Sequence, residues 1–168
     1  MGRLENKVAL ISGAAKGQGA FEAALFAKEG AKVVLADIDI DSCESNARHI
    51  VESGGEAVGI YLDVTSPASW EDCIKSTIKK YRSLTVLVNN AGIYSRVPIE
   101  EASSEEFDLI IAVNLKGVFL GTKYSIPEME EWARTYFSAI ENSQAPDIEY
   151  PPVYLSEKKS LRVIGVKP

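Results

Sequence analysis

Residues 8–19 read Val-Ala-Leu-Ile-Ser-Gly-Ala-Ala-Lys-Gly-Gln-Gly, an apolar run followed by a turn that contains three glycines. The apolar run predicts a buried strand, and the residues after the turn have the apolar spacing of a helix. Glycines at 13, 17 and 19 allow positive φ angles and let an anion approach the N–H groups at the start of that helix. The stretch therefore predicts a strand, a phosphate-binding turn and a helix.

A second apolar run, Lys-Val-Val-Leu-Ala at 32–36, ends at Asp37, 18 residues after Gly19. This is close to the spacing at which a carboxylate binds the 2′-hydroxyl of an adenosine ribose. The alternative is a βαβ unit that binds no nucleotide and has a surface Asp37. The order of strand, glycine turn, helix, strand and acid favours a bound nucleotide.

The spacing of apolar residues further along the chain predicts the fold class. Strand-like runs recur at 7–12, 32–37, 57–62 and 84–89, and the segments between them have helical periodicity. Gly30 and Gly54 are expected to close the first two helices, and Ser66-Pro67 to open the third. The sequence thus predicts an α/β fold with a Rossmann-like, doubly wound parallel sheet.

The segment 104–126 predicts a long apolar helix. Ser103 is a candidate N-cap, and Glu105 and Glu106 fall in the first turn, where the helix dipole favours acids. The apolar residues that follow cover more of the circumference than one stripe, so we expect burial on more than one side. Such a helix needs a covering partner, and a second copy of the chain would make the protein a homo-oligomer.

The composition changes at Pro127, since five of the seven prolines and one of the twelve glycines lie from there to the end. Residues 128–141 predict a further helix, and 161–166 predict a short strand. We therefore expect a dinucleotide-binding domain over 1–126. Residues 127–168 are expected to form a divergent, proline-containing tail, not a separate domain, which leaves the sheet incomplete at its C-terminal side.

Length, charge and cysteine content limit the function classes. A chain of 168 residues with 46% hydrophobic residues predicts one domain, and a net charge of −6 argues against nucleic acid or an anionic membrane surface as a partner. No uninterrupted apolar stretch approaches the length needed to span a bilayer. Cys43 and Cys73 lack the spacing of metal ligands, so we expect no metal site and a reducing, cytoplasmic location. His49 is expected to lie on the surface.

Five motifs occur in an order that is found in a known family. The glycine turn, Asp37, Asp63-Val64, the Asn-Asn-Ala-Gly run at 89–92 and Val113-Asn114 make residues 4–126 resemble the short-chain dehydrogenase/reductase family. The resemblance implies hydride transfer between a nicotinamide dinucleotide and a small alcohol or ketone substrate. It also implies a set of cofactor-binding residues: Ser12, Gly13, Ala15, Lys16, Gly17, Gln18, Gly19, Asp37, Ile38, Asp63, Val64, Asn90, Ala91 and Gly92.

Asp37 also predicts which dinucleotide binds. A carboxylate accepts hydrogen bonds from a ribose diol but repels the 2′-phosphate of NADP, so the sequence favours NAD. Lys16 favours NADP, because a basic residue at that position accompanies NADP preference in some members of the family. The side chain of Asp37 would occupy the space of the added phosphate, and we give it the greater weight.

The resemblance implies catalytic roles for four residues. Asn114 would support a water molecule of a proton relay, Tyr154 would act as general acid or base, Lys158 would lower the tyrosine pKa, and Ser143 would polarise the carbonyl. Nothing between 127 and 153 resembles the family's fifth strand, and two prolines precede Tyr154. The alternative is therefore a truncated or catalytically inactive family member that binds dinucleotide or only folds.

Overall fold

The computed structural model describes the backbone of residues 2–142 and the side chains of residues 2–134. Strands and helices alternate along this part of the chain, and the last three segments form one long helix. In order, the elements are β1 (Val8–Ser12), α1 (Gly17–Lys28), β2 (Lys32–Asp37), α2 (Ile40–Glu52), β3 (Glu56–Tyr61), α3 (Pro67–Tyr81), β4 (Val86–Val88), α4 (Ser104–Ile111), the π-helical segment η1 (Ala112–Lys116) and α5 (Gly117–Asn142).

The four strands form one parallel sheet with the order β3-β2-β1-β4. Val8 pairs with Lys32 in β2, and Ala9 pairs with Val86 in β4. The predicted strands are confirmed, although the fourth is shorter than expected. Strands β2 and β4 lie on opposite sides of β1. After β3 the chain crosses back over the sheet, so the strand order reverses at the position between β1 and β4.

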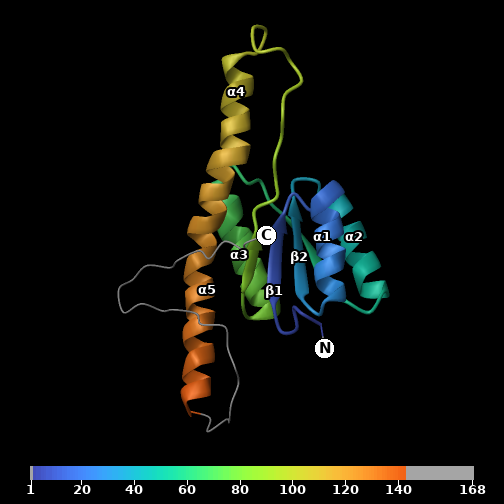
Figure 1. Ribbon diagram of the computed structural model, residues 1–168, viewed down its shortest axis with the longest axis vertical. Coiled ribbons are helices and arrows are strands. Elements are labelled where there is room, and N and C mark those ends of the chain that lie inside the picture. Colours follow the sequence, from blue (N-terminus) through green and yellow to red (C-terminus); the bar gives the residue numbers. More distant parts are fainter. Residues whose placement is uncertain (1, 143–168) are drawn as a thin grey trace.

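Helices cover both faces of this sheet, with α1 and α2 on one face and α3 and α5 on the other (Figure 1). Alternate strand residues supply the two cores. Ile11 and Leu35 pack with Ala23 of α1 on the first face, and Leu10 and Val34 pack with α3 on the second. The predicted α/β, doubly wound, Rossmann-like fold is confirmed.

Local signals in the sequence set the helix boundaries. Gly30 and Gly54 follow α1 and α2 with φ angles of +94° and +88°, which favour glycine. Ser66 caps α3 by accepting a hydrogen bond from the N–H of Ser69, and Pro67 occupies the first position of the helix. The inward face of this helix consists of the buried Trp70, Cys73, Ile74 and Thr77. These predicted boundaries are confirmed.

The long helix does not end near Pro127, so the prediction of a separate helix over 128–141 is wrong. Helix α5 continues through Pro127 to Asn142. Tyr124 and Met129, on either side of the proline, pack against the second core, and the Lys7 ammonium lies 4.8 Å from the centre of the Trp132 ring. We attribute the continuity to this packing, which outweighs the hydrogen bond that proline cannot donate.

One side of the long helix packs on the sheet and the other is exposed. Leu120 is buried, whereas Phe107, Leu115 and Phe119 are each at least 60% exposed. The predicted burial on more than one side is therefore not met by the described residues. Residues 104–134 also form a helix that is long and apolar enough, by length and composition alone, to cross a membrane. This criterion admits polar and a few charged residues, so it is looser than the uninterrupted apolar stretch considered in the sequence, and core helices of water-soluble proteins also meet it.

Candidate functional site

Candidate cofactor residues from all four strands lie at one edge of the sheet. The strands are parallel, so their carboxyl ends share this edge. The glycine turn follows β1, Asp37 ends β2, Asp63 lies just after β3 and Asn90 lies just after β4. The predicted cofactor residues are thus brought to the edge where the strand order reverses, which is where open α/β sheets bind ligands.

The three glycines of the turn differ in their φ angles and in the space around them. Gly13 has a φ of +68°, and a Cβ there would lie 2.7 Å from the Cα of Ala91. Gly19 packs directly against the carbonyl oxygen of Gly13 and the side-chain amide of Asn90. Gly17 has a φ of +59°, and a Cβ there would meet nothing within 4 Å. Gly13 and Gly19 allow close packing, and Gly17 lies beside open space.

The open space adjoins the start of α1, where hydrogen-bond donors are available. Lys16, the N-cap residue, is extended with a φ of −157°, and its side chain does not cap the helix. The first turn contains no acid, and Lys16, Gly17 and Gln18 are exposed. Gln18 donates to the carboxylate of Glu22 at 2.8 Å. An uncapped helix start of this kind favours an anion, so these residues fit the pyrophosphate of a dinucleotide.

The Asp37 carboxylate is held by two backbone groups at the end of β2. One oxygen accepts the N–H of Ala15 in the turn at 3.3 Å, and the other accepts the N–H of Asp39 at 3.1 Å. Ile38, between the two aspartates, is 65% exposed. Asp37 therefore presents a positioned negative charge beside the glycine turn.

Asp63 and Val64 lie after β3 and are fixed by short-range contacts. One carboxylate oxygen of Asp63 accepts both the N–H and the hydroxyl of Thr65, at 2.9 and 2.8 Å. The Val64 carbonyl accepts the indole N–H of Trp70 at 3.0 Å, and Val64 packs against Gly117 of α5. Asp63 remains half exposed at the strand edge, whereas Val64 is buried.

Ser12 and Asn90 join the turn to the segment after β4. The buried Ser12 hydroxyl donates to the carbonyl of Val88 and accepts the N–H groups of Asn90 and Ala91, at 3.1 and 3.2 Å. The side-chain amide of Asn90 donates to the carbonyls of Ser12 and Gly13, both at 3.0 Å. Ser12 is only 1% exposed, so its role is to position the backbone of the neighbouring segments.

Asn114 of η1 lies next to the same edge. Its amide oxygen accepts the N–H of Ile93 at 2.8 Å, and its amide nitrogen donates to the carbonyl of Ile93 at 2.7 Å. The exposed Gly92 is close by, since a Cβ there would lie 3.5 Å from the Asn114 amide oxygen. The long helix is thereby tied to the loop that follows β4. The other predicted catalytic residues, Ser143, Tyr154 and Lys158, lie outside the described residues.

Both cysteines are buried and free. Burial raises the pKa of the Cys43 and Cys73 thiols to about 12, so neither is a thiolate nucleophile near neutral pH. His49 is exposed, as predicted. Within residues 2–142, no group of three or more His, Cys, Asp or Glu side chains is arranged to hold a metal ion.

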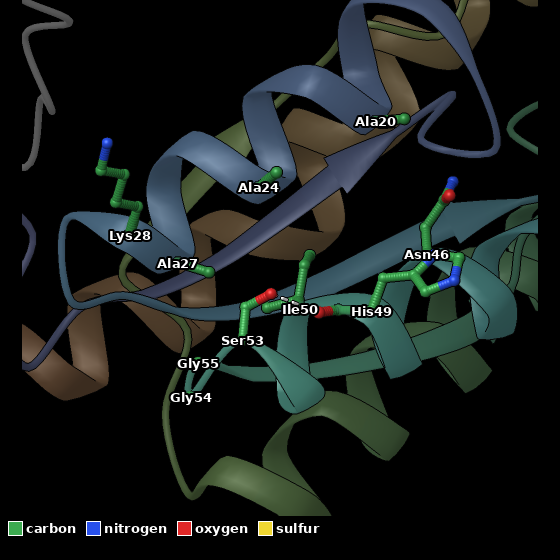
Figure 2. Close-up of a pocket in the computed structure, with 10 residues that line it drawn as sticks. All are labelled: Ala20, Ala24, Ala27, Lys28, Asn46, His49, Ile50, Ser53, Gly54 and Gly55. Atoms are coloured by element: carbon green, nitrogen blue, oxygen red, sulfur yellow. Dashed lines mark hydrogen bonds between the residues drawn. The ribbon is translucent and has the colours of Figure 1, made fainter.

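A groove of about 610 Å³ lies between α1 and α2 (Figure 2). Small residues of α1 and the glycines after α2 form much of its lining. Asn46, at one end of this groove, donates to the carbonyl of Ala15 in the turn at 2.9 Å. This contact could not be predicted from the sequence, because Asn46 lies among other polar residues of a surface helix.

The comparison with protein families decides the assignment. A model of the short chain dehydrogenase family matches residues 7–136. The chain belongs to the short-chain dehydrogenase/reductase family. The resemblance predicted over residues 4–126 is confirmed, and the match continues ten residues beyond it.

Several relatives of this short-chain dehydrogenase/reductase are named as dehydrogenases. The 2,5-dichloro-2,5-cyclohexadiene-1,4-diol dehydrogenase of Sphingobium indicum is 44% identical over 127 residues, which are 76% of this chain and 51% of the relative. The cyclopentanol dehydrogenase of Comamonas testosteroni is 37% identical over 78% of this chain and 52% of its own. The 3-alpha-(or 20-beta)-hydroxysteroid dehydrogenase of Mycobacterium bovis is 41% identical over 79% and 50%, respectively.

A solved structure agrees with the sequence relatives. A short-chain type dehydrogenase/reductase from Mycobacterium marinum superposes with a TM-score of 0.74 at 32% identity. The match covers 77% of this chain and 52% of that one. The chain thus spans about half the length of the relatives that it matches.

Proposed function

We propose that this chain binds NAD(H) at the carboxyl edge of its sheet and serves hydride transfer between the nicotinamide and an alcohol or carbonyl substrate. The observation that carries the proposal is the position of Asp37, bonded to the N–H of Ala15 beside the uncapped start of α1. A carboxylate there suits the ribose diol, and the helix start suits the pyrophosphate. The names of the relatives, which are dehydrogenases of alcohols, support the same reaction class.

The charges around Asp37 support NAD over NADP. Hydrogen bonds from the hydroxyl and N–H of Ser42 lower the pKa of Asp39, and the positive charge of Lys16 adds to this effect. Lys16 therefore acts on a second carboxylate two residues from Asp37. A 2′-phosphate at this position would meet two negative charges and one shared positive charge, which disfavours it.

We propose that residues 1–126 form the dinucleotide-binding domain and that residues 127–168, a tail and not a separate domain, supply Ser143, Tyr154 and Lys158. When bound, the nicotinamide supplies a hydride acceptor or donor. In this proposal Tyr154 takes the alcohol proton, Lys158 keeps the tyrosine acidic enough near neutral pH, and Ser143 and Asn114 assist. Two buried, unbridged thiols suit a reducing compartment, and the cytoplasm is the proposed location.

An NADH fluorescence titration tests the binding step. We expect saturable binding of NADH, weaker binding of NADPH, and an affinity for NADH about tenfold lower in Asp37→Asn, because a charge-assisted hydrogen bond is lost. Asp41→Asn is the matched control, since it removes the same charge from an exposed position on α2. Absence of binding at millimolar NADH would refute the proposal.

A second candidate function is that of a catalytically inactive or truncated family member that binds dinucleotide or only folds. The exposed apolar side of the long helix favours it, since an exposed apolar patch marks either an interaction surface or a destabilised fold. Turnover of a cyclic alcohol with NAD, abolished by Tyr154→Phe, would rule this candidate out. Binding of NADH without turnover would favour it.

The same apolar side supports a homo-oligomer through the helix at 104–126. Phe107, Leu115 and Phe119 would then lie at the contact between copies. Sedimentation velocity of the purified chain tests this arrangement. A monomer at tens of micromolar would contradict it.

A further inference from the structure

Asn46 of α2 holds one residue of the glycine turn from a helix that itself contributes no residue to the predicted cofactor site. Its side-chain nitrogen donates to the carbonyl of Ala15 at 2.9 Å. Figure 2 shows Asn46 at the end of the α1–α2 groove nearest to Ala20, which lies in the first turn of α1. The contact spans 31 positions in the sequence and joins α2 to the start of α1.

Both backbone polar groups of Ala15 form hydrogen bonds. Its N–H donates to the Asp37 carboxylate at 3.3 Å, and its carbonyl accepts from Asn46. The preceding residue, Ala14, donates to the carbonyl of Ala36 at 3.3 Å. Two of these three bonds tie the turn to the end of β2, and the third comes from Asn46.

The third bond fixes the peptide that enters α1. The carbonyl of Ala15 and the N–H of Lys16 belong to one planar trans peptide and point in opposite directions. Because Asn46 holds the carbonyl toward α2, the N–H of Lys16 points away from α2. Gly17 follows with a φ of +59° and no side chain, so the neighbouring backbone has little other restraint.

We propose that Asn46 is a positioning residue for the dinucleotide: it holds the Ala15–Lys16 peptide so that Asp37 and the N–H groups at the start of α1 face the same ligand. Without the bond, the Ala15 carbonyl is free to rotate, and the bond between Ala15 and Asp37 loosens with it. The proposal rests on the proposed NAD(H) site and adds a residue to its support. It predicts that Asn46 affects both affinity and the discrimination between NADH and NADPH.

Titration of the full chain with NADH and NADPH tests the inference. We expect Asn46→Ala to raise the Kd for NADH about fivefold, which corresponds to about 1 kcal/mol, and to raise the Kd for NADPH less. Asn46→Asp keeps the shape of the side chain but places an acceptor against the Ala15 carbonyl, so we expect a loss at least as large. Both Kd values should be compared with the melting temperature of each variant.

Arg48→Ala is the control, since Arg48 is an exposed residue of the same helix. It should leave the Kd for NADH and the ratio of the two Kd values unchanged. If the wild-type chain binds NADH and both Asn46 variants bind it within twofold of the wild type, the inference fails and the proposed function stands. An equal loss in Arg48→Ala would assign the effect to the stability of α2 and would also overturn it. If the wild type itself does not bind, the proposed function has failed first.

Discussion

The glycine turn and the long helix differ in how many of their groups have partners elsewhere in the chain. In the turn, Ser12, Gly13 and Ala15 are bonded to three other segments of the chain. In the long helix, Phe107 and Phe119 are exposed although both are large and apolar. The turn is thus bonded to the end of β2, to α2 and to the segment after β4, whereas the long helix packs on one side and exposes apolar side chains on the other.

The largest expected effect is at the contact that fixes the long helix to the sheet. Trp70 is fully buried, its indole donates to Val64, and Gly121 of α5 packs against its ring. We expect Trp70→Ala to lower the free energy of unfolding by about 4 kcal/mol, measured by urea denaturation followed by circular dichroism. Trp70→Phe, which keeps most of the bulk, should cost much less. Equal losses would mean that the hydrogen bond, not the packing, holds the helix.

The next effect tests the closed packing of the turn. Gly13→Ala combines a positive φ with a backbone contact at Ala91 that has no room to move, and we expect a loss of about 3 kcal/mol. Gly17→Ala has a similar φ but open space, and should cost about 1 kcal/mol. Thermal unfolding of the pair measures the difference. A Gly17 variant as unstable as the Gly13 variant would contradict the packing described for the turn.

A third change should strengthen the long helix. Pro127 is exposed inside α5, so replacing it removes little packing and restores a donor for the carbonyl of Lys123. We expect Pro127→Ala to stabilise the chain by about 2 kcal/mol and to slow amide hydrogen exchange around Met129. Ser104→Ala, at the exposed far end of the same helix, is a suitable comparison. A destabilised Pro127 variant would show that the proline sets a bend on which the packing depends.

The smallest effect on stability, and the sharpest test of the exposed surface, is at Phe119. Phe119→Ser should change the free energy of unfolding by no more than about 0.5 kcal/mol, because the side chain is 61% exposed. It should shift the sedimentation coefficient toward that of a monomer. Phe21→Ser makes the same change on α1, where the side chain is 70% exposed. A similar shift in both variants would indicate nonspecific association.

The sequence predicted most of the turn and less of the helix, for a physical reason. Strand runs, helix-closing glycines and the Ser66 cap act over a few residues, so their patterns are visible locally. Continuation of α5 through Pro127 depends on Tyr124 and Met129 meeting a core made elsewhere in the chain. A local pattern cannot show whether such packing outweighs a lost hydrogen bond.

The site follows the same division. The spacing of Gly13, Gly17 and Asp37 predicted the carboxyl edge at which they lie. The contact between Asn46 and Ala15 joins residues 31 positions apart, and a polar residue on a polar helix does not reveal it.

The π-helical segment at 112–116 changes the angular phase of the long helix. An α-helix turns about 100° per residue, and an i→i+5 turn accommodates one additional residue. Side chains after Lys116 therefore point about 100° away from the directions that an uninterrupted helix would give them. This offset lets Asn114 meet Ile93 while Leu120 still faces the sheet. Deleting a single residue from the segment would rotate the rest of the helix by about 100°. The additional residue therefore allows the contact of Asn114 with Ile93 and the burial of Leu120 to occur in the same helix.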